Sequence, residues 1–377
     1  MKLLYIANIR LPTEKAHGIQ IMKTCEAFAK AGVEIELVVP TRHNELTTNP
    51  FAYYGVSNNL FKIVTLYVPD LIRYGRLGFL VSSIWFSERV RWWRPFWEAD
   101  IIYSRDALVL AQYLFLGRKL VFEAHAKPSF VARVVARHAH RVIVISQALR
   151  EAYTAAGVPA ERIIVAPDAV DEHLFDTVPA KIEAREMLGL PLAQHIVIYT
   201  GHLYARKGAD TLAEAAFNIP EALFVFVGGT IEDIARFKKR WGGRKNIRII
   251  GHVAPERVPL YLRAADVLVI PNSGKSEDTA RFASPMKLFE YMASGTPIVA
   301  SNVPSIREIL GDREALFVDA DDAAALVNGI TSVFAQESEA HERAVSAQRK
   351  TGEYTWGKRA KRVIGSVSNF RSSIEQS

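Results

Sequence analysis

Short apolar runs rich in β-branched residues alternate with helix-length amphipathic segments along almost the whole sequence. The pattern begins with predicted strands at residues 3–9 and 34–40, on either side of a predicted helix at residues 19–31. The runs are nearly continuously apolar, which is typical of parallel strands with both faces covered. Parallel neighbours need crossover connections, so the alternation predicts an α/β sheet with right-handed crossovers.

The alternation occurs in two series, separated by residues 168–193, which are rich in Pro, Asp and Glu. The first series continues with predicted strands at residues 101–103, 120–125, 141–146 and 163–167. The second series consists of predicted strands at residues 195–201, 223–228, 246–251, 265–271, 296–301 and 315–318. A chain of 377 residues is longer than one hydrophobic core usually organises. The sequence therefore predicts two Rossmann-like domains facing each other across a cleft, with ligands beyond the carboxyl ends of the strands.

The composition narrows the class of protein and its compartment. The single cysteine, Cys25, cannot form an internal disulfide, which favours a reducing compartment. The N-terminal apolar run meets Arg10 and Pro12 too early for a signal peptide, and no run approaches the roughly 18 apolar residues that span a bilayer. We therefore expect a cytoplasmic protein. The net charge of +7 suits nucleic acid, an anionic membrane surface or a phosphorylated substrate, but no nucleic-acid-binding motif accompanies it.

Residues 284–295 carry start and stop signals of a helix. Ser284 is a suitable N-cap and Pro285 suits the first helical position. Gly295 suits the position after the last turn, where glycine commonly ends a helix. The sequence therefore predicts a short helix that begins directly after Ser284.

Lys287 falls in the first turn of this predicted helix, where the helix dipole disfavours a cation by roughly 0.3–1 kcal/mol. A bound anion reverses that preference, because free backbone N–H groups and a nearby ammonium together form a phosphate site. The alternative is a Lys287–Glu290 pair on a solvated face, which contributes little to stability. Both interpretations stay open at the level of the residues alone.

Two stretches of the second series resemble motifs of a known enzyme family. The stretch Arg281-Phe-Ala-Ser-Pro-Met-Lys-Leu-Phe-Glu-Tyr-Met-Ala-Ser-Gly-Thr-Pro-Ile-Val-Ala-Ser301 resembles the donor-binding signature of family-four retaining glycosyltransferases of the GT-B fold. The stretch Tyr199-Thr-Gly-His-Leu-Tyr-Ala-Arg-Lys-Gly208 is similar to the phosphate-binding loop of that family. Residues 142–146 and 165–171 also fall where the family has comparable pieces. The resemblance covers essentially the whole chain.

The resemblance implies how the domains are used. Residues 1–170 would form an N-terminal acceptor-side domain, and residues 171–354 a C-terminal domain that binds the nucleotide sugar. The last helix, within residues 355–377, would cross back and pack on the N-terminal domain. The implied partners are a nucleoside-diphosphate-sugar donor and a glycan or lipid-linked acceptor, with no nucleic acid.

Individual positions of the family's donor site carry over to this sequence. Glu290 is implied to bind the ribose hydroxyls, a role that suits a carboxylate because it can accept two hydrogen bonds. Lys207 is implied to meet the pyrophosphate, and the backbone around Val253 to lie against the base. The complete expected donor-binding set is Gly18, Gly201, His202, Arg206, Lys207, Val253, Ser284, Met286, Lys287 and Glu290.

The sequence departs from the usual family pattern at three positions. Phe282 stands where a glutamate usually contacts hydroxyls of the donor sugar, and His202 stands where an arginine is common. Pro285 replaces a usual glycine and removes one backbone N–H group. We hypothesise that Lys287 compensates for the missing arginine, with Arg206 as the competing compensator.

The first series contributes three candidate site residues. Gly18 opens the first helix, where glycine lets a phosphate approach the N-terminus; a glycine needed only for the turn is the alternative. His125 and Glu123 are expected to point outward on one face at the end of their strand. The family has a histidine at a comparable point against the donor sugar, so we expect His125 to be functional. Arg105 could meet an acceptor or a phosphate, or pair with Asp106 or Glu123.

The mechanism implied by the resemblance is transfer with retention at the anomeric carbon, with no enzyme nucleophile assigned. The implied catalytic set is His125, Lys207 and Lys287. The two lysines and the helix dipoles would stabilise the leaving diphosphate electrostatically. The sequence has no Asp-x-Asp pair near a predicted strand end, so we expect neither a metal ion nor another cofactor.

Residues 73–97 interleave tryptophans with arginines. The residues concerned are Trp85, Trp92, Trp93 and Trp97 with Arg73, Arg76, Arg89, Arg91 and Arg94. Three uses of this segment stay open: packing of helices against the sheet, stacking on glycan rings, and association with a membrane surface. Trp85, Trp92 and Trp93, together with Arg105, are the residues predicted for the acceptor or membrane side.

The sequence thus predicts a retaining glycosyltransferase that builds a cell-surface polysaccharide or a glycolipid, in the cytoplasm or at the inner face of the membrane. One alternative is a non-catalytic nucleotide-sugar-binding partner, because the sugar-reading glutamate is absent at position 282. A second alternative is a GT-B epimerase, which would need an acid/base pair around the sugar. The nucleotide base, the sugar and the acceptor are not specified by the sequence.

Overall fold

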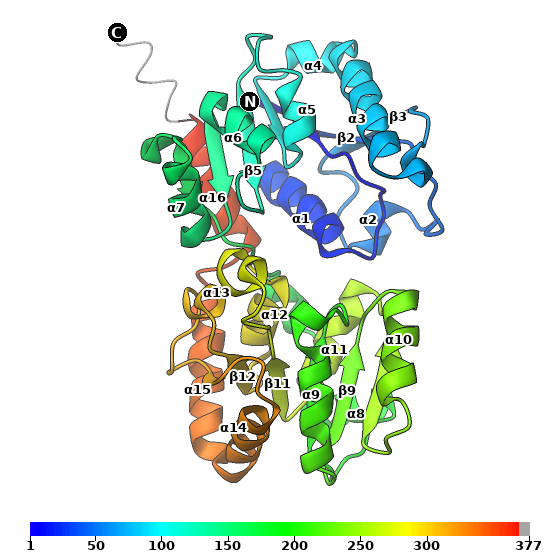
Figure 1. Cartoon of the computed structure of the whole chain (residues 1–377), viewed down its shortest axis with the longest axis vertical. Helices are drawn as coiled ribbons and strands as arrows, with labels where there is room; N and C mark the ends of the chain where they lie inside the picture. Colours follow the sequence, from blue (N-terminus) through cyan, green and yellow to red (C-terminus); the bar gives the residue numbers. More distant parts are fainter. Residues whose placement is uncertain (369–377) are drawn as a thin grey trace. The chain divides into compact units, whose positions relative to one another are not determined.

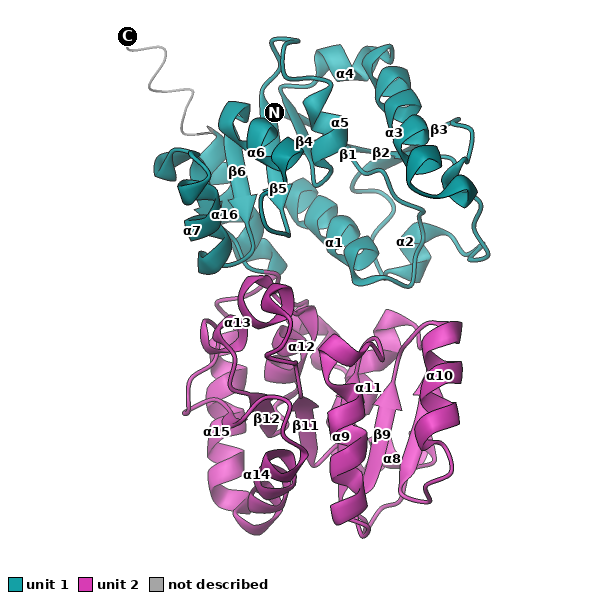
Figure 2. Ribbon diagram, viewed as in Figure 1, with its two compact units in different colours: residues 1–167, 356–377 teal, residues 168–355 magenta. Residues whose placement is uncertain are grey.

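The computed structural model describes residues 1–368 and divides the chain into two compact units (Figure 1, Figure 2). Unit 1 contains Met1–Pro167 and the C-terminal helix α16 (Trp356–Ser368). Unit 2 contains Asp168–Thr355. Each unit has its own parallel sheet with helices packed against it, so the predicted fold class of two Rossmann-like α/β domains is confirmed. Residues 369–377 of the predicted C-terminal segment lie outside the described residues.

The sheet of unit 1 has the strand order β3-β2-β1-β4-β5-β6-β7, with parallel pairing throughout. Its strands are β1 (Lys2–Ile6), β2 (Glu34–Pro40), β3 (Lys62–Leu66), β4 (Ile101–Ser104), β5 (Leu120–Ala124), β6 (Arg141–Val144) and β7 (Ile163–Val165). The α-helices before α16 are α1 (Ala16–Lys30), α2 (Pro50–Tyr53), α3 (Gly75–Arg91), α4 (Arg94–Glu98), α5 (Ala107–Ala111), α6 (Phe130–His138) and α7 (Gln147–Ala155). Short 3₁₀ turns are η1 (Ile72–Tyr74) and η2 (Ala160–Arg162).

The sheet of unit 2 has the order β10-β9-β8-β11-β12-β13, again with parallel pairing. Its strands are β8 (Ile196–Thr200), β9 (Leu223–Val227), β10 (Ile247–Gly251), β11 (Val267–Ile270), β12 (Ile298–Ser301) and β13 (Leu316–Val318). Its α-helices are α8 (Lys181–Leu188), α9 (Ala209–Ala215), α10 (Ile231–Trp241), α11 (Val258–Ala264), α12 (Met286–Ser294), α13 (Pro304–Arg307), α14 (Ala323–Ala335) and α15 (Glu337–Thr351). Short turns are η3 (Glu172–Phe175), η4 (Ala205–Lys207), η5 (Ala216–Asn218), η6 (Pro255–Arg257) and the π-helical η7 (Asp278–Phe282).

Each apolar run that predicted a strand overlaps a strand of the structure, usually one or two residues shorter at its ends. The prediction missed β3. This strand lies at the edge of its sheet, and its side chains are exposed or half-buried. An edge strand with little burial needs no continuous apolar run, so the sequence pattern did not mark it.

In both sheets the strand order reverses beside the first strand of the unit. β1 lies between β2 and β4, and β8 lies between β9 and β11. Doubly wound sheets bind ligands beyond the carboxyl ends of the strands at such a switch point. The fold therefore favours binding sites in the chain that follows β1 and β4 in unit 1, and β8 and β11 in unit 2.

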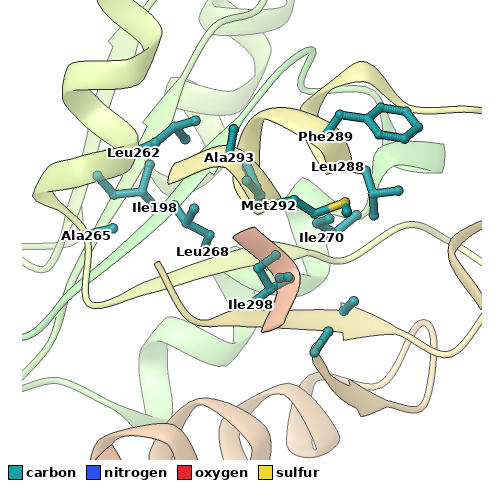
Figure 3. Close-up of a cluster of buried hydrophobic side chains, with 14 of the residues drawn as sticks. Ile198, Leu262, Ala265, Leu268, Ile270, Leu288, Phe289, Met292, Ala293 and Ile298 are labelled. Atoms are coloured by element: carbon teal, nitrogen blue, oxygen red, sulfur yellow. The ribbon is translucent and has the colours of Figure 1, made fainter. Parts of the chain in front are cut away.

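Helix α12 is anchored in the hydrophobic core of unit 2 (Figure 3). Leu288, Phe289 and Met292 are fully buried in one cluster with Ile270 of β11 and Ile298 of β12. Burying a side chain of this size stabilises the fold by roughly 1.5–3 kcal/mol. The polar residues that α12 carries between these anchors are therefore held at fixed positions relative to the strands.

Candidate functional site

Side chains of α12 reach the carboxyl end of β8, at the switch point of unit 2. The Tyr291 hydroxyl of α12 accepts a hydrogen bond of 2.8 Å from the backbone N–H of Thr200, the last residue of β8. Lys287, one turn earlier in α12, places its Nζ 4.0 Å from the centroid of the buried Tyr199 ring. A Cβ added at Gly201 would lie 4.0 Å from the same Nζ. The ammonium of Lys287 is thus beside the loop that follows β8.

Lys287 is buried, with 9% of its surface exposed. Within the described part of the chain, its Nζ has no hydrogen-bond partner. Burial lowers the pKa of Lys287 well below its usual value, and the charge of Lys207 acts in the same direction while Glu290 opposes it. The predicted alternative, a Lys287–Glu290 pair on a solvated face, is wrong because the helix turns Lys287 toward the protein interior. A buried, unpaired ammonium is costly unless an anion binds it.

Two further charged groups beside Lys287 also have perturbed pKa values. Burial raises the pKa of the half-buried Glu290 to about 7, and the Lys287 ammonium only partly opposes this. Burial also lowers the pKa of Lys207, and the positive charge of Arg206 adds to that shift. Ionisable groups with perturbed pKa values that share one edge of a sheet are typical of a functional site.

The loop after β8 packs directly against the chain that follows β11. Gly208 adopts a left-handed φ of 74°, and a Cβ at this position would lie 1.5 Å from the carbonyl oxygen of Pro271. No other residue fits there without moving backbone. The close approach fixes the preceding Lys207, which is half-buried at the end of η4.

The predicted residues His202 and Arg206 lie in this same loop but point to different surroundings. The ring of His202 stacks on Tyr204 at 4.9 Å between centroids, and its Nδ1 lies 3.7 Å from a carboxylate oxygen of Asp233. Arg206 is exposed, with its guanidinium 5.1 Å from the centroid of the Tyr204 ring. Of the two competing compensators for the missing arginine, the structure therefore places Lys287 closer to the glycine of the loop.

The prediction that Ser284 caps α12 is wrong. The helix begins at Met286, and Pro285 adopts an extended backbone conformation in the cap position. Ser284 is then one residue too far from the helix, and its hydroxyl instead accepts a hydrogen bond of 3.0 Å from the backbone N–H of Asp168. The predicted end is confirmed, since Gly295 follows the last turn with a left-handed φ of 67°.

Two other positions of the donor motif are turned toward protein. Phe282, at the position where the resemblance implies a glutamate, is buried at the end of η7 with the Arg281 guanidinium 5.6 Å from its ring centroid. Val253, in the loop after β10, is half-buried and packs against the core of unit 2. The side chain of Val253 therefore supports the loop, which leaves its backbone as the part that could contact a base.

A cavity of about 450 Å³ lies at the switch point of unit 1. Its lining includes Asn8 after β1, His17 at the start of α1, and Arg105 after β4. Burial lowers the pKa of His17 to about 4, and the positive charges of Arg105 and Lys15 lower it further. His17 is therefore neutral at pH 7, in a cavity whose charged lining residues are Arg105 and Asp106, which suits a polar ligand.

The carboxylate of Glu123 lies at the centre of a buried polar cluster in unit 1. It accepts hydrogen bonds from Gln20 Nε2 at 2.7 Å, from the Tyr103 hydroxyl at 2.7 Å and from Arg359 of α16. His125 Nε2 lies 2.9 Å from the same carboxylate, which can only accept, so this nitrogen carries a proton. Burial alone would raise the pKa of Glu123, but Arg359 and His125 hold it well below its usual range.

Glu123 and His125 therefore differ from the prediction that both point outward. Glu123 has no exposed surface, because its strand is covered on both faces and partners from three elements surround its carboxylate. His125, just after β5, remains partly exposed. Arg105 forms no close salt bridge with Asp106 or Glu123, although its charge helps to lower the pKa of Glu123. Its guanidinium donates a 2.6 Å hydrogen bond to the side-chain oxygen of Gln20. The predicted sugar-side role of His125 stays a prediction.

Gly18 has a packing role. A Cβ at this position would lie 2.1 Å from the hydroxyl of Tyr54. That hydroxyl is fixed by Thr13, from whose N–H it accepts a bond of 2.7 Å and to whose carbonyl it donates one of 2.8 Å. Close approach of Tyr54 therefore requires glycine here, and a contact of Gly18 with a donor stays a prediction.

The tryptophans of residues 73–97 do not all pack against the sheet. Trp85, Trp92 and Trp97 have 50%, 79% and 49% of their surfaces exposed, and Trp93 is half-buried. Core packing therefore does not account for the first three. Glycan stacking and membrane association remain as uses of this surface.

Two notable residues were not predicted. Asn272 follows β11 at the switch point of unit 2 and is fully buried, and neither atom of its amide has a hydrogen-bond partner among residues 1–368. A polar residue directly after an apolar strand run was a usable signal for it. Arg359 gave no such signal, because its partner Glu123 is more than two hundred positions away in the sequence.

A second cavity, of about 540 Å³, lies in unit 2 at the amino ends of the strands, opposite the end at which Lys287 lies. Its lining includes His195, Ala265 and Thr296, which precede β8, β11 and β12. Since parallel strands present their amino ends at one edge, this cavity is remote from Lys287. In the described chain there is no group of three or more His, Cys, Asp or Glu residues that could hold a metal ion. Nor does any described helix have the length and hydropathy required to cross a membrane.

Comparison with solved structures defines the fold. Sucrose-phosphate synthase from Thermosynechococcus elongatus superimposes with a TM-score of 0.77 and 19% identity, over 100% of both chains. HepE of Anabaena in complex with UDP gives a TM-score of 0.75 and 18% identity, over 98% of this chain and 100% of that chain. The chain therefore has the two-domain GT-B architecture.

Sequence comparison adds the family. The model described as Glycosyltransferase Family 4 matches residues 18–174, and the model described as Glycosyl transferases group 1 matches residues 194–336. D-inositol 3-phosphate glycosyltransferase of Mycolicibacterium smegmatis is 23% identical over 94% of this chain and 86% of its own length. The protein belongs to the glycosyltransferases of the GT-B fold.

Proposed function

We propose that this glycosyltransferase moves a sugar from a nucleoside-diphosphate-sugar donor to a glycan or lipid-linked acceptor, with retention of configuration at the anomeric carbon. The observation that carries the proposal is the buried ammonium of Lys287, which has no hydrogen-bond partner among the described residues. Lys207 contributes positive charge beside it. A diphosphate would pair with both lysines and remove the cost of burying an unpaired charge.

The remaining donor contacts follow from the positions of residues around Lys287. Glu290 lies one turn further along α12, where its carboxylate would accept the two ribose hydroxyls. The backbone of the loop at Val253 would meet the base. With Phe282 buried in place of a carboxylate, recognition of the sugar would depend on other groups, so nucleotide recognition is better supported than sugar recognition. HepE of Anabaena has been solved with UDP-glucose, which makes uridine nucleotides the first donors to test.

The chemistry we propose is electrostatic. The acceptor hydroxyl oxygen would bond to the anomeric carbon as the bond from that carbon to the phosphate oxygen breaks. The leaving diphosphate would take up the hydroxyl proton, and Lys207 and Lys287 would stabilise its developing charge. His125 would lie against the sugar, oriented by the hydrogen bond between its Nε2 and Glu123. The unit 1 cavity, with Arg105 and His17 in its lining, is our candidate acceptor site.

The relatives support a role in glycolipid or polysaccharide synthesis. Alpha-galactosylglucosyldiacylglycerol synthase of Streptococcus pneumoniae is 25% identical over 48% of this chain and 51% of its own length. Its name specifies a glycolipid product, as expected of an enzyme that uses a lipid-linked acceptor, which is one of the two acceptor classes that we propose. We further propose that the protein acts in the cytoplasm, at the inner face of the membrane where a lipid-linked acceptor would be presented.

Isothermal titration calorimetry with UDP, ADP and GDP, their monophosphates and their glucose conjugates tests donor binding. We expect one diphosphate series to bind at least tenfold more tightly than its monophosphate, because the second phosphate would meet the lysines.

Slow hydrolysis of the bound sugar nucleotide without acceptor would distinguish an enzyme from a non-catalytic binding partner. Nuclear magnetic resonance of the released or transferred sugar would report the anomer, and an inverted product would contradict retention. Sugar interconversion with the nucleotide still attached would instead identify an epimerase.

A further inference from the structure

Helix α3 of unit 1 has its two faces reversed relative to an ordinary surface helix. The face turned to the protein carries mainly small or polar residues, and the buried positions are Gly78, Ser82, Ser83, Phe86, Ser87 and Val90. The exposed large apolar residues of the helix are Leu77, Leu80, Val81, Ile84 and Trp85. A surface helix of a soluble domain normally buries its large apolar residues and exposes polar ones. The apolar face of α3 therefore lacks a partner among the described residues.

The buried face is built for close packing. The hydroxyls of Ser83 and Ser87 donate to backbone carbonyls one turn earlier in α3, at 2.7 and 2.9 Å. Ser82 accepts from the backbone N–H of Leu71 and donates to the carbonyl of Pro69. These polar groups are satisfied within unit 1, so the orientation of α3 is specified by its own contacts.

The exposed apolar residues form one continuous stripe. Leu77, Val81 and Ile84 are spaced by four and three residues, so they lie on one side of the helix. Leu77 is 76% exposed, and Ile84 and Trp85 are about half exposed. Tyr67 and Tyr74, just before α3, are also largely exposed. A contiguous apolar surface of this kind marks an interaction site.

Arginines border this apolar stripe. Residues 67–97 contain five arginines and two acidic residues, Asp70 and Glu88. Asp70 lies 3.7 Å from Arg42, and Arg94 is paired with Glu98 just beyond the segment. Glu88 is itself paired with Arg91 at 2.6 Å. Arg73, Arg76 and Arg89 are exposed. Trp92 adds an indole that is 79% exposed, with the Arg91 guanidinium 5.3 Å from its ring centroid.

We propose that α3, with the segments from Tyr67 to Trp97 that flank it, docks on the surface of an anionic lipid bilayer. The apolar stripe would enter the boundary between headgroups and acyl chains, and the arginines would contact lipid phosphates. Tryptophan and arginine suit this depth, because each has an apolar body and a polar or charged end.

Two other occupants fit the surface less well. A symmetric pair of copies would bring the same arginine cluster of each copy against the other, which like charges oppose. A glycan binds preferentially in a concave site, whereas the exposed stripe is the convex side of a helix and the cavity of unit 1 has a different lining. Charge complementarity therefore selects an anionic membrane.

This inference deepens the proposed function, because membrane docking would select a lipid-linked acceptor over a soluble glycan. It does not require the donor site, since none of its residues belongs to unit 2. The two proposals can consequently fail separately. A protein that binds vesicles but no sugar nucleotide would contradict the proposed function and leave membrane docking intact.

Vesicle flotation of the full chain tests the docking surface. We compare vesicles of pure phosphatidylcholine with vesicles containing about one third phosphatidylglycerol. The wild type should float with the anionic vesicles, and its tryptophan emission should shift to shorter wavelength as exposed indoles leave water. The variant Leu77→Gln/Ile84→Gln should bind at least about tenfold more weakly, since two apolar side chains leave the bilayer. The variant Arg76→Gln/Arg89→Gln should lose the preference for anionic lipid.

A matched control uses exposed apolar residues that lack the arginine border. Ile182 and Met187 of α8 are 63% and 62% exposed, and Ile182→Gln/Met187→Gln should leave vesicle binding unchanged. Donor hydrolysis in solution should be the same in all variants, which also shows that each has folded. The proposal is overturned if the wild type stays unbound or if the control variant loses binding equally. It is also overturned if sedimentation shows a dimer that only Leu77→Gln/Ile84→Gln dissociates.

Discussion

Two buried charged groups, Glu123 of unit 1 and Lys287 of unit 2, differ in how their hydrogen-bonding capacity is met. In unit 1 the carboxylate of Glu123 is fully buried and accepts hydrogen bonds from Gln20, Tyr103 and Arg359. In unit 2 the ammonium of Lys287 is buried without a hydrogen-bond partner in the described chain. Both groups lie near the carboxyl ends of parallel strands, so position in the fold does not explain the difference.

We interpret the satisfied Glu123 cluster as a structural framework and the unsatisfied Lys287 as part of a binding site. A fully satisfied buried network holds its members in place and keeps their charges, which is why the pKa of Glu123 stays well below its usual range. An unsatisfied group is expensive in the free protein and gains when a ligand of opposite charge arrives. Unit 1 therefore orients His125 through contacts of its own, whereas in unit 2 the donor that we propose would supply the partner that Lys287 lacks.

Removing the carboxylate of Glu123 should lower the free energy of unfolding more than any other change that we consider. Glu123→Ala leaves the guanidinium of Arg359 buried without its carboxylate, so we expect the free energy of unfolding to fall by about 3–5 kcal/mol. Chemical denaturation monitored by circular dichroism measures this change. Glu151→Ala, at an exposed glutamate of α7, should change stability by less than about 0.5 kcal/mol. The double variant Glu123→Leu/Arg359→Met should recover much of the loss, and a loss equal to the sum of the two single variants would contradict the coupling.

Removing the charge of Lys287 should not lower the stability of the protein, in contrast to removing the charge of Glu123. Lys287→Met should leave the free energy of unfolding unchanged or increase it, because no hydrogen bond is lost. The same variant should bind nucleoside diphosphate roughly 10–100-fold more weakly, as expected for one charge-assisted contact. Calorimetry and chemical denaturation on one preparation measure both quantities.

Arg206→Met provides the matched comparison for Lys287→Met. Its guanidinium is exposed over Tyr204, so we expect less than about a threefold change in diphosphate affinity. Unchanged affinity in Lys287→Met together with a large loss in Arg206→Met would assign the compensating cation to Arg206. The structure would then have identified the wrong partner for the diphosphate.

The pH dependence of stability sharpens the same contrast. Burial raises the pKa of Glu290 from 4.5 to about 7, so the folded state binds more protons than the unfolded state between these values. Stability should therefore fall as the pH rises through this window, by on the order of 2 kcal/mol after allowing for solvent around a half-buried group. Glu290→Gln should remove this slope in denaturation series at pH 5 to 8. Equal slopes in the two proteins would show that Glu290 titrates normally.

His17 should give stability a pH dependence of the opposite sign over part of this range. The pKa of His17 is lowered to about 4, so its contribution to stability is lost as the pH falls from 6.5 toward 4. His17 is unchanged in Glu290→Gln, and the difference between the two proteins therefore isolates the carboxyl. The measurement should be read as this difference rather than as the absolute slope.

The sequence predicted well what depends on local periodicity. Continuous apolar runs identified β8 and β11, and a glycine after the last turn identified the end of α12 at Gly295. The start of α12 was misjudged because Pro285 and Ser284 each suit more than one cap position, and the bond between Ser284 and Asp168 is invisible to local rules. Local rules also cannot see that α12 turns Lys287 inward.

Contacts between distant segments were the main omission. The partners of Glu123 come from α1, β4 and α16, and no spacing in the sequence relates them. The reversed faces of α3 were equally hidden, because a helix with apolar and small polar stripes fits either orientation until its neighbours are known. The predicted donor motif could be proposed from the sequence because its residues are contiguous, whereas the unit 1 cluster is assembled only by folding.

The smallest expected change in stability is that of Asn272→Leu. This variant tests whether the buried amide of Asn272 lacks a partner, as Lys287 does. Its amide is fully buried, and neither atom has a hydrogen-bond partner among residues 1–368. If the amide is simply unpaired, Asn272→Leu should change the free energy of unfolding by less than about 1 kcal/mol, because a similar volume is filled and no bond is lost. Asn246→Leu is the control, since that amide donates to the carbonyls of Ala216 and Ile219 and should cost about 1–3 kcal/mol. A loss for Asn272→Leu as large as the control's would mean that a buried water satisfies Asn272. Asn272 would then be satisfied as Glu123 is, and the contrast with the Glu123 cluster would rest on Lys287 alone.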